Sequence, residues 1–264
     1  MDLGFQGKTA VVTGGSKGIG KAIARTFLDE GANVAICARN AEELKNTADE
    51  LSAFGNVYAE VVDCTIEQQV YDFAQHIFEK FGSVDAWVNN VGASVFKKGE
   101  EFTDADLEFI NAVCFKSAVF GSQAAYRYMK KTGGGIVNIS SLAARCPTAG
   151  RSTLYGPMKA AINNLTQCLA GEYAAHGVRV NCVMPGFTAT PAVKATIKQS
   201  ELDYNARGTL LNRVAEPEEI AAPVVFLASE KASYMTGTTI EASGGRSITL
   251  NPTFAWDNLE KENG

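Results

Sequence analysis

Histidine is scarce in this sequence of 264 residues, and closely paired cysteines are absent. The two histidines, His76 and His176, are a hundred positions apart, and neither has a second metal-binding side chain at a usual spacing. The six cysteines are scattered, several lie in apolar runs, and no two form a Cys-x-x-Cys pair. We therefore expect no metal site and no disulfide framework of the kind that staples small secreted domains.

The sequence also lacks long hydrophobic runs, a surplus of positive charge, and linker or low-complexity segments. No apolar run approaches the ~20 residues that span a bilayer, and the first residues lack the basic-then-apolar pattern of a signal peptide. The formal net charge of −5 disfavours a nucleic-acid partner. We expect a metal-free, cytoplasmic, single-domain protein that binds neither nucleic acid nor membrane.

Strands and helices alternate strictly along the chain. Short β-rich runs are predicted at 8–13, 33–39, 57–62, 84–88, 135–139, 178–183 and 238–242. Helices are predicted at 21–30, 41–51, 67–81, 104–130 and 217–229, and one more carries Tyr155 and ends near residue 177. This alternation predicts an α/β fold with a doubly wound parallel sheet of seven strands and helices on both faces. Ligands of such sheets bind beyond the carboxyl ends of the strands, where the strand order reverses.

A glycine-rich segment, residues 13–20, connects the first predicted strand to the first predicted helix. Glycines let the backbone approach a pyrophosphate closely, and the N-terminus of a helix offers unpaired N–H groups and a partial positive charge. The segment therefore predicts dinucleotide binding, with a plain tight turn as the alternative. Its candidate binding residues are Gly14, Ser16, Lys17, Gly18, Ile19 and Gly20.

The end of the second predicted strand indicates which dinucleotide is bound. An acidic residue there would grip the ribose hydroxyls of NAD and would repel a 2′-phosphate. The sequence instead reads Ala38-Arg39-Asn40, in which the alanine leaves room and the planar fork of Arg39 can meet a phosphate. Because Lys17 adds positive charge, we predict NADP(H) rather than NAD(H); a solvated surface arginine is the alternative.

Tyr155 and Lys159 are four residues apart, so they lie one turn apart on the same face of a predicted helix. A phenol normally holds its proton to pH ~10, and a nearby ammonium favours the phenolate form. A hydroxyl from Ser140 or Ser141 can hold a substrate oxygen at that phenol. These groups together predict proton transfer between a ketone and a secondary alcohol.

These motifs, in this order, resemble the short-chain dehydrogenase/reductase family over residues 8–245, with a Rossmann fold. The resemblance covers the segments 13–20, 63–65, 89–92 and 185–190, as well as Ser141, Tyr155 and Lys159. It implies Tyr155 as the general acid/base, Ser141 as the residue that orients the substrate oxygen, and Lys159 as a ligand of the nicotinamide ribose. Further implied cofactor positions are Asp63 at the adenine, Thr188 and Thr190 near the carboxamide, and also Asn40, Cys64, Asn90, Gly92, Pro185 and Gly186.

Two choices stay open within this resemblance. Neighbouring residues in a strand point to opposite faces, and counting back from the tyrosine favours Ser141, which would leave Ser140 as a structural hydroxyl. The family usually adds an asparagine from the long fourth helix to its proton relay. The motif spacing puts this position at Cys114, whereas Asn111 lies three residues earlier on a neighbouring part of the same face. Either Asn111 substitutes from the next turn, or Cys114 holds the relay position, or Cys114 is small buried packing.

Substrate choice in the family comes mainly from the segment 189–214, together with loops near 93–95 and 142–154. The segment 189–214 here mixes apolar with basic side chains such as Lys194. This mixture would fit an alicyclic or steroid-like ketone with an acidic tail, and it would also fit a thioester on a carrier. The extended C-terminal tail resembles that of bacterial hydroxysteroid dehydrogenases, so we favour the ketone. The alternatives are a 3-oxoacyl thioester on an acyl carrier, which Arg127, Lys130 and Lys131 would attract, and a regulatory protein that binds NADP(H) without catalysis.

The family also leads us to expect a homotetramer or homodimer, because the 104–130 helix and the Tyr155 helix carry more apolar surface than one sheet face covers. Residues 246–264 form an extension beyond the domain of residues 1–245. This extension contains Phe254 and Trp256, and it either docks over a neighbouring subunit's cleft or is a loose end.

Overall fold

The computed structural model of the protein describes residues 2–150 and 153–263. Seven parallel strands form one sheet in the order β3-β2-β1-β4-β5-β6-β7, which confirms the predicted doubly wound α/β fold. The strands are β1 (Thr9–Thr13), β2 (Asn33–Ala38), β3 (Val57–Val61), β4 (Ala86–Asn89), β5 (Gly134–Ile139), β6 (Val178–Pro185) and β7 (Thr239–Ala242). The strand order reverses between β1 and β4, so a ligand site is expected at their carboxyl ends.

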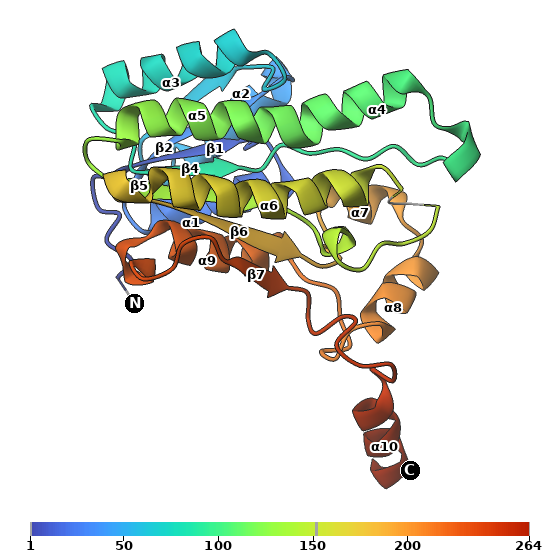
Figure 1. The fold of residues 1–264 in the computed structure, drawn as a ribbon. Helices are drawn as coiled ribbons and strands as arrows, with labels where there is room; N and C mark the ends of the chain where they lie inside the picture. The colour runs from blue at the N-terminus through green and yellow to red at the C-terminus, as the bar shows by residue number, and fades with distance from the viewer. Residues whose placement is uncertain (1, 151–152, 264) are drawn as a thin grey trace.

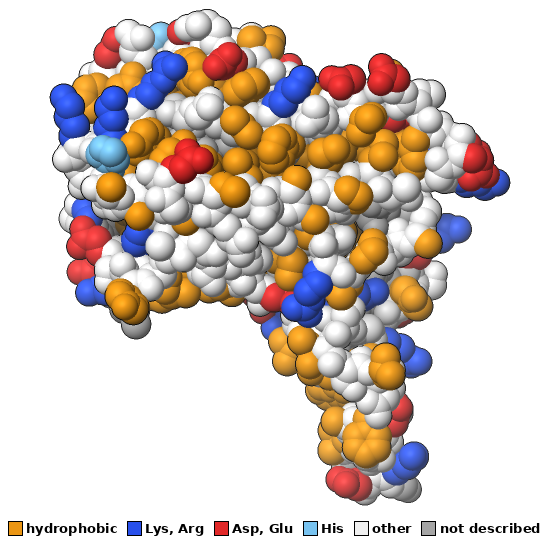
Figure 2. Space-filling model, in the orientation of Figure 1, with side chains coloured by type: hydrophobic (Ala, Val, Ile, Leu, Met, Phe, Trp, Pro, Cys, Tyr) orange, Lys and Arg blue, Asp and Glu red, His pale blue; other side chains and the backbone are white. Residues whose placement is uncertain are grey.

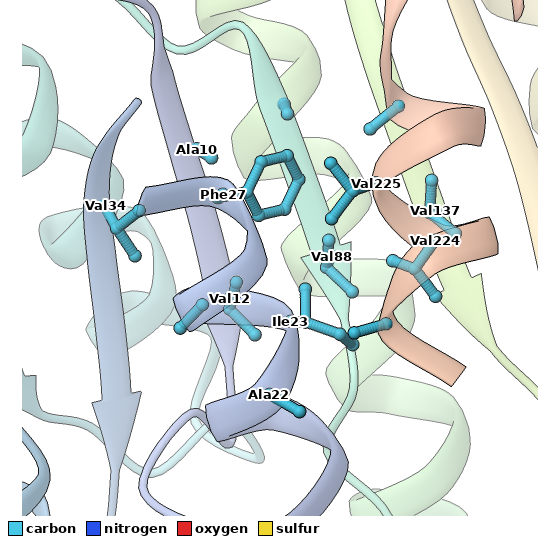
Figure 3. Packing of buried hydrophobic residues seen from close by; sticks show 14 of the residues in the cluster. Ala10, Val12, Ala22, Ile23, Phe27, Val34, Val88, Val137, Val224 and Val225 are labelled. Atoms are coloured by element: carbon cyan, nitrogen blue, oxygen red, sulfur yellow. The ribbon is translucent and has the colours of Figure 1, made fainter. Parts of the chain in front are cut away.

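Helices cover both faces of the sheet (Figure 1). One face carries α1 (Gly18–Asp29), α2 (Ala41–Leu51) and α9 (Pro217–Ala228), and the other carries α3 (Glu67–Phe81), α5 (Ser117–Met129) and α6 (Tyr155–Tyr173). Because the strands are covered on both sides, most of them read as continuous apolar runs. In Figure 3, Ile23 and Phe27 of α1 and Val225 of α9 lie against the sheet residues Val12 and Val88.

The helix expected at 104–130 is not a single regular helix, so this prediction was wrong in detail. α4 (Asp104–Ile110) begins at a capping box between Thr103 and Asp106, Asn111–Lys116 is π-helical, and α5 follows directly. A π-helical turn accommodates an extra residue that hydrophobic periodicity does not register, and such turns are frequent at functional sites. The turn contains both Asn111 and Cys114.

The substrate segment and the tail contain helices that the sequence pattern did not reveal. α7 (Pro191–Thr196) and α8 (Gln199–Arg207) lie within the segment 189–214, and α10 (Phe254–Asn263) projects from the body at the C-terminus (Figure 1). Trp256 Nε1 donates a hydrogen bond to the Leu210 carbonyl oxygen at 3.0 Å and so ties the tail to the chain beyond α8. Phe254 is 63% exposed, so the tail offers apolar surface to solvent.

Among the described residues, no helix has the length and apolarity needed to cross a bilayer. Within 2–150 and 153–263, no three His, Cys, Asp or Glu side chains converge on a possible metal position.

Candidate active site

A cavity of about 1250 Å³ opens at the carboxyl edge of the sheet. It is larger than the ~300–1,000 Å³ of typical ligand pockets, so it has room for a dinucleotide and a substrate side by side. All cofactor positions expected from the sequence line it, and so does Ser141. Parallel topology brings these residues together because the loops after β1, β2, β3, β4, β5 and β6 leave the same edge of the sheet.

The turn after β1 presents bare backbone to the cavity. Gly14 and Gly18 have φ angles of +65° and +53°, which side-chain-bearing residues rarely adopt. A Cβ on Gly20 would stand 2.2 Å from the Gly14 carbonyl oxygen and 2.6 Å from Asn90 Nδ2. That nitrogen donates to the carbonyl oxygens of Thr13 and Gly14, both at 3.1 Å, and so ties the end of β4 to the turn. Since Lys17, the N-cap residue of α1, makes no side-chain cap hydrogen bond, the first N–H groups of the helix are suited to a diphosphate.

Farther along the cavity wall lie the ends of β2 and β3. Arg39 is exposed on this wall, and within the described part of the chain its guanidinium forms no ion pair. Asp63 accepts hydrogen bonds from the Thr65 N–H at 2.9 Å and the Thr65 hydroxyl at 2.7 Å, which hold its carboxylate in place. Cys64 Sγ lies 3.7 Å from Cys37 Sγ. The contact with Cys64, together with burial, raises the pKa of the Cys37 thiol, so this thiol stays protonated and unreactive at neutral pH.

An acidic side chain that the sequence analysis missed, Glu43 of α2, lies on the same wall. Its carboxylate accepts a hydrogen bond from Ser16 Oγ at 2.5 Å and pairs with Lys17 Nζ at 2.8 Å. The Lys17 contact and then the Ser16 contact lower the pKa of the Glu43 carboxyl. A signal was present in the sequence, because Asn40 and Glu43 have the spacing of a helix cap and its third residue. Asn40 does accept from the Glu43 N–H at 2.9 Å, but the Glu43 carboxylate reaches the glycine-rich turn instead of the cap.

Tyr155 is the first residue of α6, and Lys159 follows one turn later. Lys159 Nζ lies 5.6 Å from the centre of the Tyr155 ring. Lys159 is only 2% exposed, and its Nζ donates to the Ile139 carbonyl oxygen, at the end of β5, at 2.7 Å. A Cβ on Gly92 would stand 3.1 Å from the same nitrogen, so the loop after β4 passes closely over the ammonium. The cation is therefore fixed between β5, this loop and the phenol.

The two adjacent serines have different partners. Ser140 is buried, and its hydroxyl donates to the Lys159 carbonyl oxygen at 2.9 Å. Ser141 is half-buried on the cavity wall, where its Oγ accepts from the Ala143 N–H at 3.2 Å. That acceptance leaves the Ser141 proton available for a substrate oxygen. The geometry therefore supports Ser141 as the substrate-facing hydroxyl and Ser140 as an anchor of α6.

Cys114 and Asn111 lie in the same π-helical turn but at different places relative to the site. Cys114 is buried, and its thiol donates to the Ala93 carbonyl oxygen at 3.2 Å. A Cβ on Gly92 would be 4.0 Å from Cys114 Sγ, so the thiol lies behind the loop that covers Lys159. Asn111 is half-buried, and neither Asn111 nor Cys114 is among the residues that line the cavity.

The remaining wall of the cavity comes from residues within 187–205, the loop 93–96, the loop 142–149 and Arg246. Phe96 and Tyr204 line it while 70% and 73% exposed, so they stand at its mouth. Arg246 also lines it, and its Nη1 donates to the Asn205 carbonyl oxygen at the end of α8 at 2.8 Å. Lys194, expected to help select the substrate, pairs instead with Glu216 at 2.8 Å. Phe96 directly follows the loop 93–95 that was expected to contribute to substrate choice, whereas Arg246 was missed because it lies outside the segments that the sequence singled out.

Known proteins resemble this chain over most of its length. A family model described as enoyl-(acyl carrier protein) reductase matches residues 14–247. A tropinone reductase homologue of Arabidopsis thaliana is 37% identical over 246 residues, covering 92% of this chain and 93% of its own. The 3-oxoacyl-[acyl-carrier-protein] reductase of Chlamydia pneumoniae is 33% identical over 247 residues, covering 93% and 99%.

Two solved structures share the fold throughout. L-sorbose reductase from Gluconobacter frateurii, in complex with NADPH and L-sorbose, has a TM-score of 0.88 and 32% identity, covering 95% of this chain and 100% of its own. A 7α-hydroxysteroid dehydrogenase, in complex with NADH and 7-oxoglycochenodeoxycholic acid, has a TM-score of 0.88 and 33% identity, covering 95% and 98%.

Proposed function

The chain belongs to the short-chain dehydrogenase/reductase family of oxidoreductases that act on CH–OH groups, and from this premise we propose that it interconverts a ketone and a secondary alcohol with NADP(H). The observation that carries the proposal is the grouping of Ser141, Tyr155 and the buried Lys159 on one cavity wall. The bare turn of Gly14, Gly18 and Gly20 and the uncapped N-terminus of α1 fit a diphosphate at the other end of the same cavity.

The residues at the adenosine end favour NADP(H) over NAD(H). Arg39 follows β2 where an acidic residue would select NAD, and its planar guanidinium suits a phosphate. Asp63 and Cys64 line the part of the wall that would meet the adenine. When the dinucleotide is bound, its nicotinamide supplies the hydride for ketone reduction and accepts it from the alcohol.

The protein's own groups handle the proton. In ketone reduction, the Tyr155 hydroxyl donates its proton to the carbonyl oxygen while the Ser141 hydroxyl donates a hydrogen bond to the same oxygen. The Lys159 ammonium, held at 2.7 Å by the Ile139 carbonyl, stabilises the phenolate that remains. In alcohol oxidation the same phenolate takes the proton back, so one arrangement serves both directions.

A cyclic, largely apolar ketone fits the mouth of the cavity. Phe96 and Tyr204 offer aromatic surface there, and Phe187 also lines the cavity. Relatives named for tropinone and for a 7α-hydroxysteroid support the alicyclic or steroid-like class. Basic side chains such as Lys194 were the reason for expecting an acidic tail on the substrate. Because Lys194 is paired with Glu216, it no longer supports that expectation.

A 3-oxoacyl thioester on an acidic carrier is the second candidate, since the Chlamydia relative is named for that reaction. The basic residues expected to attract the carrier lie near the end of α5 and just before β5, at the amino edge of the sheet, opposite the cavity (Figure 1). Arg127 there stacks on Tyr71, with its guanidinium carbon 3.7 Å from the ring centre. A carrier bound at these residues would be far from Tyr155, so we favour the ketone.

For the proton relay we propose Cys114 rather than Asn111 as the residue that supports Lys159. Neither side chain lines the cavity, but the Cys114 thiol donates to the Ala93 carbonyl oxygen at 3.2 Å, in the loop that passes over the ammonium. Replacing Cys114 with Asn and measuring turnover tests this role. A large loss is expected if the thiol holds the loop, and unchanged turnover would contradict it.

We also propose that the enzyme is a homotetramer or homodimer. Apolar side chains gather over α4 and α5 in Figure 2, and they include Leu107 and Phe109, which are 39% and 40% exposed. Light scattering that gave a monomer mass would refute this proposal.

The test of the function is NADPH oxidation, followed at the nicotinamide absorbance, with cyclic ketones, steroid ketones and a 3-oxoacyl thioester as substrates. Turnover of a cyclic ketone that disappears in Tyr155→Phe would support the proposal, because this change removes only the phenolic oxygen. Preference for the thioester would replace the ketone with the second candidate. Tight NADPH binding without turnover of any substrate would refute the proposed reaction.

A further inference from the structure

A carboxylate, that of Glu43, lies in the corner of the cavity proposed for the adenosine. The other residues of this corner are Ser16, Lys17 and Arg39. Ser16 and Lys17 offer an O–H and an ammonium, and Glu43 engages both, at 2.5 and 2.8 Å. Arg39 is the remaining cation, and it has no carboxylate partner within the described residues. Two of the three groups suited to a phosphate are thus already bound to a carboxylate.

This arrangement is built into the packing of α2 against the glycine-rich turn. The buried Thr47, one turn beyond Glu43, donates from its hydroxyl to the Ser16 carbonyl oxygen at 2.6 Å. At the start of the helix, Asn40 accepts from the Glu43 N–H at 2.9 Å. These two contacts fix the first turns of α2 beside Ser16, so the Glu43 carboxylate meets the turn because the helix is docked there.

A carboxylate and a phosphate compete for the same donors because both accept hydrogen bonds through anionic oxygens. A 2′-phosphate that took Lys17 and Ser16 would displace Glu43 and leave two anions close together, which is unfavourable at the partly exposed surface. A ribose 2′-hydroxyl has no charge to compete with Glu43. The contacts of Glu43 would therefore persist with NADH and be lost with NADPH.

Resting on the proposed NADP(H)-dependent function, we infer that Glu43 is a specificity-determining residue that occupies Ser16 and Lys17 and so weakens NADPH binding relative to NADH. Arg39 sets the preference for the phosphate, and Glu43 limits it. The expected consequence is an enzyme whose discrimination between the two cofactors is smaller than Arg39 and Lys17 alone would give.

The test is the binding of NADPH and NADH, followed by nicotinamide fluorescence, to the wild type and to the variants Glu43→Gln and Glu43→Ala. The glutamine variant removes the charge but keeps an oxygen that Ser16 can reach, and the alanine variant removes both. Glu42→Gln is the matched control, since Glu42 is exposed in the same helical turn but does not line the cavity. Adenosine 2′,5′-bisphosphate and AMP serve as probes that lack the nicotinamide.

Both Glu43 variants are expected to bind NADPH and the bisphosphate about tenfold more tightly, because the carboxylate that competes for Ser16 and Lys17 is gone. Their affinities for NADH and AMP are expected to stay within about twofold of the wild-type values. Glu42→Gln is expected to change none of the four by more than about twofold, because a solvated charge off the wall is largely screened. Weaker NADPH binding in the Glu43 variants, or an equal effect from Glu42→Gln, would overturn the inference.

The two failures are distinguishable. A wild type that binds neither cofactor refutes the proposed function and this inference with it. A wild type that binds both, combined with Glu43 variants that leave the ratio of the two affinities unchanged, refutes the inference alone.

Discussion

Replacing Gly20 with alanine is the sharpest test of the cofactor site, because the structure fixes what one added carbon would meet. The new Cβ would lie 2.2 Å from the Gly14 carbonyl oxygen and 2.6 Å from Asn90 Nδ2, whereas real Cβ contacts are essentially never below 3.0 Å. The closer neighbour is backbone, so the turn after β1 must move away from α1 by about 1 Å to accept it. Overpacking of this kind costs roughly 1–3 kcal/mol of folding stability.

The larger expected effect is on cofactor binding, because the displaced turn and helix N-terminus are the groups that fit the diphosphate. A displacement of about 1 Å in a positioned site costs about 100-fold, so Gly20→Ala is expected to weaken NADPH binding by about 100-fold. The assay is a fluorescence titration with NADPH, with a thermal melt of the same samples. Binding within about threefold of the wild type would refute the reasoning.

Gly171→Ala is the matched control, since it makes the same substitution in a helix. A Cβ there has nothing within 4 Å, so the helix gains propensity without a clash. The free energy of unfolding of the Gly171→Ala variant is expected to rise by about 0.5–1 kcal/mol, and the affinity of this variant for NADPH is expected to be unchanged.

Four further outcomes are expected. Arg179 donates five hydrogen bonds at 2.8–3.4 Å to carbonyl oxygens at and beyond the end of α9. Arg179→Met should therefore lower the free energy of unfolding by about 3–4 kcal/mol and the melting temperature by roughly 10 °C. A fall in melting temperature of less than about 3 °C would contradict this. Ser141→Ala should lower kcat/KM for ketone reduction by about 10²–10³ with little change in melting temperature. Ser140→Ala, which leaves the Lys159 carbonyl without its buried donor, should lower stability by about 1–2 kcal/mol. If Ser140→Ala lost activity and Ser141→Ala lost stability instead, the roles assigned to the two serines would have to be exchanged. The contact with Glu60 raises the pKa of His76 in the folded protein. The contribution of this contact to stability is therefore present below about pH 6.5 and is lost as the pH rises through the folded-state pKa. Thermal melts of His76→Gln should lack this small pH dependence, and a pH profile equal to that of the wild type would rule the contribution out.

The sequence predicted the fold through local patterns that need no tertiary information. Apolar runs of strand length, each followed by a helical pattern, indicated a parallel sheet covered on both faces, because only strands buried on both sides read in this way. The spacing of Tyr155 and Lys159 put them one helical turn apart, and the glycines at 14, 18 and 20 marked a turn that side chains would block. These are properties of neighbouring residues, so one sequence is enough to show them.

Features that depend on contacts between distant segments were not predictable from such patterns. The π-helical turn at 111–116 interrupts a helix whose periodicity looked continuous, because one extra residue hardly changes the apolar spacing. The pairing of Glu43 with Ser16 and Lys17 depends on how α2 docks on the loop after β1, some 27 residues away in the chain. No spacing rule connects these positions.

By itself, then, the sequence determined the layers of the fold, the end of the sheet where a ligand is expected to bind, and the chemical groups available there. The tertiary structure decided which of those groups meet: that Ser140 holds the Lys159 carbonyl while Ser141 lines the cavity, and that Lys194 is taken by Glu216. The physical reason is that residue type and local spacing set the conformation of each segment, whereas partners are set by the packing of helices against the sheet.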